Sequence, residues 1–233
     1  MTQHGYRERR GAMGRVVEAR VPPIGLAGTL SIPDNAQGLI VFAHGSGSSR
    51  LSPRNMKVAD GLGANGFATM LFDLLTLDEE DDRANVFDID LLATRLVDAV
   101  EWLGREPLTA GLRCGLFGAS TGAAAALVAA ARLGERIQAI VSRGGRPDLA
   151  GRALDQIRIP TLLIVGGADS GVIELNEQAL ARLRGPKALE IVPGATHLFP
   201  EPGALDAVID HAVRWFTLYL GGPASAVRPA AQD

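Results

Sequence analysis

Residues 118–122, Gly-Ala-Ser-Thr-Gly, place Ser120 between two glycines, where a strand-like apolar run changes into an alanine-rich helical one. Glycines at these positions permit a tight strand-to-helix turn that exposes the serine hydroxyl at a helix N-terminus. A serine hydroxyl needs a general base to become a nucleophile, and that base needs an acid to orient it. Asp169 and His197 each follow a strand-like run. We therefore predict a nucleophile at Ser120, an orienting acid at Asp169 and a base at His197.

Such a nucleophile also requires backbone N–H donors for the oxyanion that forms during attack on a carbonyl. The Thr121 N–H, directly after the serine, is the first predicted donor. The glycine-rich stretch "AHGSGSS" at residues 43–49 follows another apolar run, and we predict Ser46 as the second donor, with Gly47 as the alternative. His44 in the same stretch is expected to brace this loop, because His197 already occupies the position of the base.

Four arginines follow the strand ends that would border the same crevice: Arg50, Arg54, Arg143 and Arg146. Guanidinium groups suit bidentate recognition of carboxylate or phosphate. One interpretation is that these arginines and Gly47 contact the substrate and bind an anionic group beside the scissile ester. The other is that they form structural ion pairs with Asp73, Asp148 or the acidic stretch that follows residue 77. The sequence leaves both open.

Alternating strands and helices are expected to position these residues. Residues 15–21 and 26–33 predict a hairpin with a turn at 22–25. Further strands are predicted at 38–45, 67–75, 112–118, 137–143, 161–167 and 188–194, and helices at 53–65, 89–103, 121–133, 174–183 and 205–220. This order predicts an α/β fold with a mostly parallel sheet, helices on both faces and an N-terminal antiparallel hairpin. The carboxyl ends of such strands form the ligand crevice.

The length of 233 residues suits one domain. We expect a flexible N-terminus at 1–14, a single domain at 15–220 and a disordered tail at 221–233, because the tail is rich in small and polar residues and prolines. The longest apolar stretch, 123–131, is about half of what a membrane span needs. The polar start resembles no secretory signal. These features predict a cytoplasmic protein without a membrane partner.

The composition is that of an ordinary globular protein, with 47% apolar residues and a net charge of −3. Basic residues form no stripe, which argues against a nucleic-acid partner. The single Cys114 excludes an internal disulfide and is expected to be a small buried residue. The four histidines lack metal-ligand spacing, and no glycine-rich nucleotide motif opens a helix. We therefore expect no metal and no cofactor; monomer and homodimer both remain open.

The motifs "FAHGSGSS", "GASTG", "GGAD" and "GATHLF" together resemble the α/β-hydrolase superfamily, in its dienelactone-hydrolase-like branch. The stretches "HGSGSSRLSPRN" and "VSRGGRPDLAG" are similar to small hydrolases found beside, or fused to, phosphoribosyltransferase domains. The resemblance runs from Arg15 to Leu220 and implies the triad Ser120, Asp169 and His197. Dienelactone hydrolase itself uses a cysteine nucleophile, so the serine here favours a general ester as substrate.

Many members of that superfamily insert a cap domain between two late strands, but here only the short connection 144–160 is available. We expect a shallow site without a large cap, and the acidic segment 78–87 is either its cover or a solvated loop.

The expected function is hydrolysis of a small carboxylic ester or lactone through an acyl-enzyme. An acyltransferase or thioesterase would use the same triad, and a non-catalytic binding protein could keep the same fold.

Overall fold

A single nine-stranded sheet runs through the computed structural model, which describes residues 7–11 and 14–221. The strands lie in the order β1-β2-β3-β5-β4-β6-β7-β8-β9. Their bounds are β1 Arg7–Gly11, β2 Gly14–Val21, β3 Leu26–Ile32, β4 Gly38–Ala43, β5 Phe67–Phe72, β6 Cys114–Ala119, β7 Ile137–Arg143, β8 Thr161–Gly166 and β9 Lys187–Val192. The neighbouring strands β5, β4, β6, β7, β8 and β9 pair parallel to one another. The pairs β1–β2, β2–β3 and β3–β5 are antiparallel. The predicted sheet with its N-terminal hairpin is confirmed.

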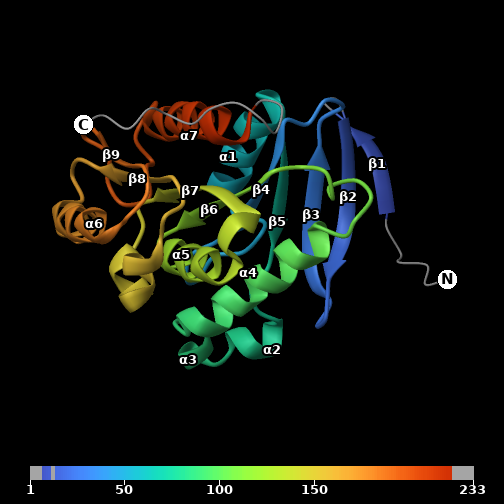
Figure 1. Cartoon of the computed structure of the whole chain (residues 1–233), viewed down its shortest axis with the longest axis horizontal. Coiled ribbons are helices and arrows are strands. Elements are labelled where there is room, and N and C mark those ends of the chain that lie inside the picture. Colours follow the sequence, from blue (N-terminus) through green and yellow to red (C-terminus); the bar gives the residue numbers. More distant parts are fainter. Residues whose placement is uncertain (1–6, 12–13, 222–233) are drawn as a thin grey trace.

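Helices cover both faces of this sheet, as Figure 1 shows. The helices are α1 Pro53–Ala64, α2 Leu77–Glu80, α3 Arg83–Val86, α4 Ile89–Leu103, α5 Thr121–Leu133, α6 Ser170–Arg182 and α7 Ala204–Leu220. Buried side chains of α4 and α5 form one core with one face of the sheet, and those of α1 and α7 form a second core with the other. Every residue of β4, β5, β6 and β8 is buried because both faces are covered.

The connection between β7 and β8 holds only a 3₁₀ segment, Pro147–Gln156, and no inserted domain. None of the described helices is long and apolar enough to cross a membrane.

The N-terminal expectation needs a correction, because residues 7–11 form β1 instead of a flexible segment. This strand pairs antiparallel with β2 along its whole length, with Arg9 opposite Val16. Without β1, the edge of β2 would leave its N–H and C=O groups unpaired. An edge strand also accepts charged residues such as those of β1. The sequence "RERRG" shows no apolar alternation that would have predicted it. The rest of the predicted N-terminal segment up to residue 13, and the predicted tail beyond residue 221, lie outside the described residues.

Candidate active site

Ser120 occupies a strained turn between β6 and α5, with φ 52° and ψ −124°. The two flanking glycines make this turn possible. A Cβ on Gly118 would lie 2.4 Å from the Cα of Ala123, and one on Gly122 would lie 2.2 Å from the carbonyl oxygen of Ala43. Both contacts are with backbone, so no side chain could be accommodated by a small shift. The Gly-x-Ser-x-Gly pattern therefore reflects the sterics of a strand–serine–helix corner.

The backbone around Ser120 is anchored to the turn that follows β7. Its N–H donates to the carbonyl oxygen of Arg143 (3.2 Å), and its carbonyl oxygen accepts from the N–H of Arg146 (3.0 Å). The side chain of Ser120 lies against Gly45, where an added Cβ would come within 2.9 Å of the serine Cβ and 3.6 Å of its Oγ. The hydroxyl is thus placed beside the loop that follows β4.

Asp169 and His197 form a hydrogen-bonded pair on the same rim of the sheet. Asp169 precedes α6, and His197 lies in the loop between β9 and α7. The Nδ1 of His197 lies 2.7 Å from Oδ2 of Asp169. A histidine that donates through Nδ1 keeps Nε2 as the acceptor. The two loops are tied together because the N–H of Ala168 donates to the carbonyl oxygen of Ala195 (2.9 Å).

The turn after β7 also touches the histidine. Gly144 has φ 51°, and a Cβ there would lie 2.9 Å from the carbonyl oxygen of His197. Arg143 and Gly144 thus contact Ser120 on one side and His197 on the other. Among the described residues no hydrogen bond joins Ser120 Oγ to His197, and in unliganded enzymes catalytic hydrogen bonds are often long until substrate binds. The structure brings the three predicted residues to one rim.

The two residues predicted as oxyanion donors are in direct contact. The N–H of Ser46 donates to the Thr121 side-chain Oγ1 (2.9 Å). The Thr121 N–H belongs to the first residue of α5, where an α-helix leaves its N–H groups without intrahelical partners. Gly47 follows with φ 66°. The role of the Thr121 hydroxyl could not be predicted from the sequence: it holds the loop after β4 against the nucleophile turn and accepts the Ser46 N–H, so the predicted Ser46 donor is already engaged.

His44 braces the same loop, as predicted. Its ring is buried, with Nε2 accepting from the N–H of Leu74 (3.1 Å) and Nδ1 lying 3.0 Å from the carbonyl oxygen of Gly45. These two partners require a neutral ring protonated on Nδ1. Burial lowers the pKa of His44 below its usual value, which keeps the ring neutral. The histidine joins the loop after β4 to the loop after β5.

The four arginines separate into two groups. Arg50 pairs with Asp73, through its N–H (2.8 Å) and through Nε (3.3 Å). Arg146 makes a bidentate pair with Asp148, at 2.9 and 2.8 Å. For these two, the structure shows the ion pairs of the second interpretation. Arg54 and Arg143 make no ion pair within the described part of the chain, and buried guanidinium nitrogens of both, like Nε of Arg50, have no hydrogen-bond partner there.

A cavity of about 530 Å³ opens beside the loop that follows β4. Its lining includes Gly45, Ser46 and Gly47, the start of α1 with Arg54, and apolar side chains from beyond β5. Gly45 packs on Ser120, so one lining residue touches the nucleophile, although Ser120, Asp169 and His197 are not themselves among the lining residues. The apolar lining includes Leu51, Leu74, Leu75, Val86 and Leu92.

The outer wall of this cavity comes from the acidic segment, which forms the helices α2 and α3 instead of a loop. Glu80 and Val86 line the cavity. Thr76 and Glu79 form a reciprocal capping box at the start of α2, and Asp82 caps α3. No residue of either helix is buried. Local capping holds the shape of the wall, while the ion pair of Glu79 with Arg95 of α4 (2.7 Å) and the packing of Val86 against the core attach it to the rest of the protein.

Cys114 lies at the opposite end of β6 from Ser120 and is buried. Burial raises the pKa of its thiol to about 12, so this thiol cannot supply a thiolate nucleophile at neutral pH. Within residues 7–11 and 14–221, no group of three or more His, Cys, Asp or Glu side chains is arranged to hold a metal ion.

A serine after β6, an acid after β8 and a histidine after β9, on a mostly parallel sheet, define the α/β-hydrolase fold. Solved structures share this fold at low identity. A lidless α/β serine hydrolase from Xanthomonas campestris is 22% identical with a TM-score of 0.69, covering 96% of this chain and 98% of that one. The structure of Est1E from Butyrivibrio proteoclasticus is 18% identical with a TM-score of 0.72, covering 87% of this chain and 97% of that one.

Residues 26–214 match the model of the dienelactone hydrolase family, and the chain belongs to this family. A dienelactone hydrolase from Anabaena variabilis is 54% identical, with a TM-score of 0.85 over 93% of this chain and 100% of that chain. Two Mycobacterium tuberculosis proteins, provisionally named phosphoribosyl transferases, are 57% identical over 207 residues, which is 89% of this chain. The chain spans about half, 47%, of the length of these two relatives.

Proposed function

We propose that this protein is a serine hydrolase that cleaves a small carboxylic ester or lactone through an acyl-enzyme. The observation that carries the proposal is the 2.7 Å hydrogen bond between His197 and Asp169, made on the rim where Ser120 is held half-buried in a strained turn. A binding protein would need neither the strained serine nor an oriented histidine beside it.

In the first half of the reaction, Ser120 Oγ attacks the carbonyl carbon while His197 Nε2 accepts the hydroxyl proton. The Asp169 carboxylate stabilises the imidazolium ion that results. The oxyanion accepts hydrogen bonds from the Thr121 N–H and from a second N–H in the loop after β4, at Gly47, because the Ser46 N–H already donates to the Thr121 hydroxyl. Collapse of the tetrahedral intermediate breaks the ester C–O bond, and His197 returns the proton to the leaving alkoxide oxygen.

In the second half, a water molecule attacks the acyl carbon while His197 Nε2 accepts one of its protons. Collapse of the second tetrahedral intermediate breaks the bond to Ser120 Oγ, which regains the proton from His197. The products are a carboxylic acid and an alcohol, or one hydroxy acid from a lactone. The cavity beside Gly45 is lined by the apolar side chains of Leu74, Leu75, Val86 and Leu92. This lining supports a small substrate with an apolar portion.

The test is hydrolysis of p-nitrophenyl esters of increasing chain length by the wild type, Ser120→Ala and Ser48→Ala. We expect Ser120→Ala to lower kcat/KM by at least about 10⁴-fold and to abolish labelling by a fluorophosphonate. Ser48→Ala is the matched control, because Ser48 lines the cavity without a role in the chemistry. A wild type that neither turns over nor becomes labelled would contradict the proposal, as would full activity in Ser120→Ala.

A further inference from the structure

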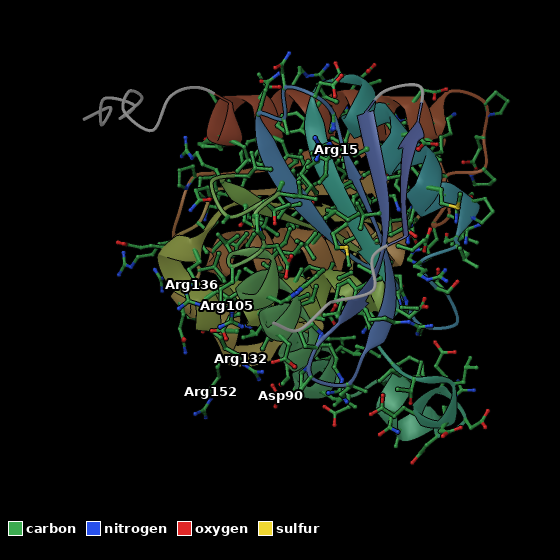
Figure 2. The ribbon with its side chains drawn as sticks, turned by 90° about the vertical axis from the view of Figure 1, so that its right-hand side faces the viewer. Arg15, Asp90, Arg105, Arg132, Arg136 and Arg152 are labelled. Carbon is green, nitrogen blue, oxygen red and sulfur yellow. The ribbon has the colours of Figure 1, made fainter. Side chains whose placement is uncertain are left out.

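Asn176 is a buried polar residue of α6 that the proposed reaction does not use. Figure 2 shows labelled arginines such as Arg132 and Arg136 projecting outward, and each of these two pairs with a carboxylate. Asn176 is instead fully buried, with 0% of the residue exposed. Burial of an amide is unfavourable unless it is hydrogen-bonded, and asparagine is a poorer helix former than alanine or leucine. An asparagine at this position therefore indicates a specific partner.

That partner is the turn that follows β7. The Nδ2 of Asn176 donates to the carbonyl oxygen of Gly145 (3.0 Å) and to that of Val172, one turn earlier in α6 (2.7 Å). Both neighbours are carbonyl oxygens, so only the amide nitrogen, with its two N–H groups, can satisfy them. The side chain thus links the backbone of α6 to the backbone of the turn.

The turn held in this way contacts both the nucleophile and the base. The carbonyl oxygen of Arg143 accepts from the Ser120 N–H (3.2 Å), and the N–H of Arg146 donates to the Ser120 carbonyl oxygen (3.0 Å). Gly144 lies against His197, because an added Cβ would come within 2.9 Å of the histidine carbonyl oxygen. A displacement of this turn therefore moves Ser120 relative to His197.

Helix α6 connects the same amide to the acid of the triad. Asp169 directly precedes α6, and its carbonyl oxygen accepts from the N–H groups of Val172 and Ile173, both at 3.0 Å. The Val172 carbonyl oxygen, in the first turn of the helix, is the second acceptor of Asn176. The amide thus joins the helix turn beside Asp169 to the turn beside Ser120.

We propose that Asn176 is a positioning residue that sets the separation between Ser120 and the His197–Asp169 pair. The inference rests on the proposed ester hydrolysis and adds a residue that touches neither the substrate nor the reacting atoms. A misplacement of about 1 Å between reacting groups lowers a rate by about 100-fold. Loss of the amide should lower kcat and leave KM nearly unchanged, because neither the turn after β7 nor α6 contributes to the cavity lining.

The first test compares Asn176→Ala with Ala179→Gly in the hydrolysis of p-nitrophenyl butyrate. Ala179 is buried in the same helix, and glycine there weakens α6 without removing a bond to the turn. We expect Asn176→Ala to lower kcat about 10- to 100-fold, with KM changed by less than about 3-fold. Ala179→Gly should keep the wild-type kcat although its Tm also falls.

The second test measures the reactivity of Ser120 without ester turnover, as the rate of labelling by a fluorophosphonate. Asn176→Asp keeps the shape of the side chain, but its carboxyl group donates a hydrogen bond only when it is protonated. Burial raises the pKa of a carboxyl group, so acid should restore the bond to Gly145. Relative to the wild type at the same pH, we expect labelling about 10-fold slower at pH 8 and close to the wild-type rate at pH 6. The ratio for Ala179→Gly should not change with pH.

Two results would overturn the role of Asn176: a wild-type kcat in Asn176→Ala, or equal losses of kcat in Asn176→Ala and Ala179→Gly. If Asn176→Ala does not fold, the labelling of Asn176→Asp decides, and a ratio that does not change with pH contradicts the role. Failure of the proposed hydrolysis would look different. In that case the wild type turns over no ester, while the labelling rates still show whether Asn176 positions Ser120; a wild type that is not labelled would overturn both.

Discussion

Replacement of the buried Arg143 by methionine should stabilise the protein, because Nε and Nη1 of this arginine have no hydrogen-bond partner among the described residues. Burial, and then the neighbouring charge of Arg54, lower the pKa of Arg143 from its ordinary value to about 10. At about 1.4 kcal/mol for each pKa unit, the folded state disfavours the charged side chain by about 3 kcal/mol. Methionine fills a similar length of apolar space and adapts to irregular cavities, at a packing cost of about 1 kcal/mol. The free energy of unfolding should therefore rise by about 1 to 3 kcal/mol.

Urea unfolding followed by circular dichroism, at pH 7.5 in Tris chloride without phosphate or carboxylate, measures this difference. Arg146→Met is the control, because the paired, partly exposed Arg146 contributes at most about 1 kcal/mol of stability, and its loss should not stabilise. The wild type should have a lower free energy of unfolding than Arg143→Met. This difference should be constant below pH 10 and shrink above it, since the folded state then releases the Arg143 proton before the unfolded chain does. A loss of stability in Arg143→Met above about 1 kcal/mol would refute the argument that this cation is uncompensated.

Three further substitutions test other parts of the site. Asp169→Asn should lower kcat for ester hydrolysis by about 10³- to 10⁴-fold with little change in Tm, because the base loses its orienting acid; an unchanged kcat would contradict that role. Gly122→Ala should cost about 3 kcal/mol in urea unfolding because its Cβ meets backbone, whereas Gly171→Ala, with open space around it, should not destabilise. The free energy of unfolding of the wild type should fall from pH 7 to pH 5, because the unfolded chain protonates His44 before the folded state does. In His44→Gln this fall should be smaller. An equal fall in both proteins would exclude His44 as the cause.

Elements whose signal is local could be predicted from the sequence. The bounds of α4 and α5 agree with the predicted 89–103 and 121–133, since apolar periodicity and the glycine-rich corner act over a few residues. The turn at Ser120 was predictable for the same reason, because its sterics involve its own flanking glycines. Helix α6 begins at Ser170, four residues before the predicted start at 174, because the Ser-Gly pair hides the first turn.

Features that depend on distant partners could not be predicted. The strand β1 exists because β2 has a free edge, and the bond between Ser46 and Thr121 joins residues 75 positions apart. The fate of each arginine also depends on tertiary placement. Arg146 has an acid two residues away and pairs with it, whereas Arg143 is buried at the end of β7, a central strand that α5 and α7 contact.

The wall built from α2 and α3 has a consequence for how this enzyme family can diversify. None of its residues is buried, and the caps of Thr76 and Asp82 maintain its shape from within the segment. Substitutions at its exposed positions, such as Glu80, alter the cavity lining while leaving the free energy of unfolding nearly intact, since surface changes rarely exceed about 0.5 kcal/mol. Selection could therefore retune substrate preference at this wall in many small steps, without first acquiring extra stability elsewhere.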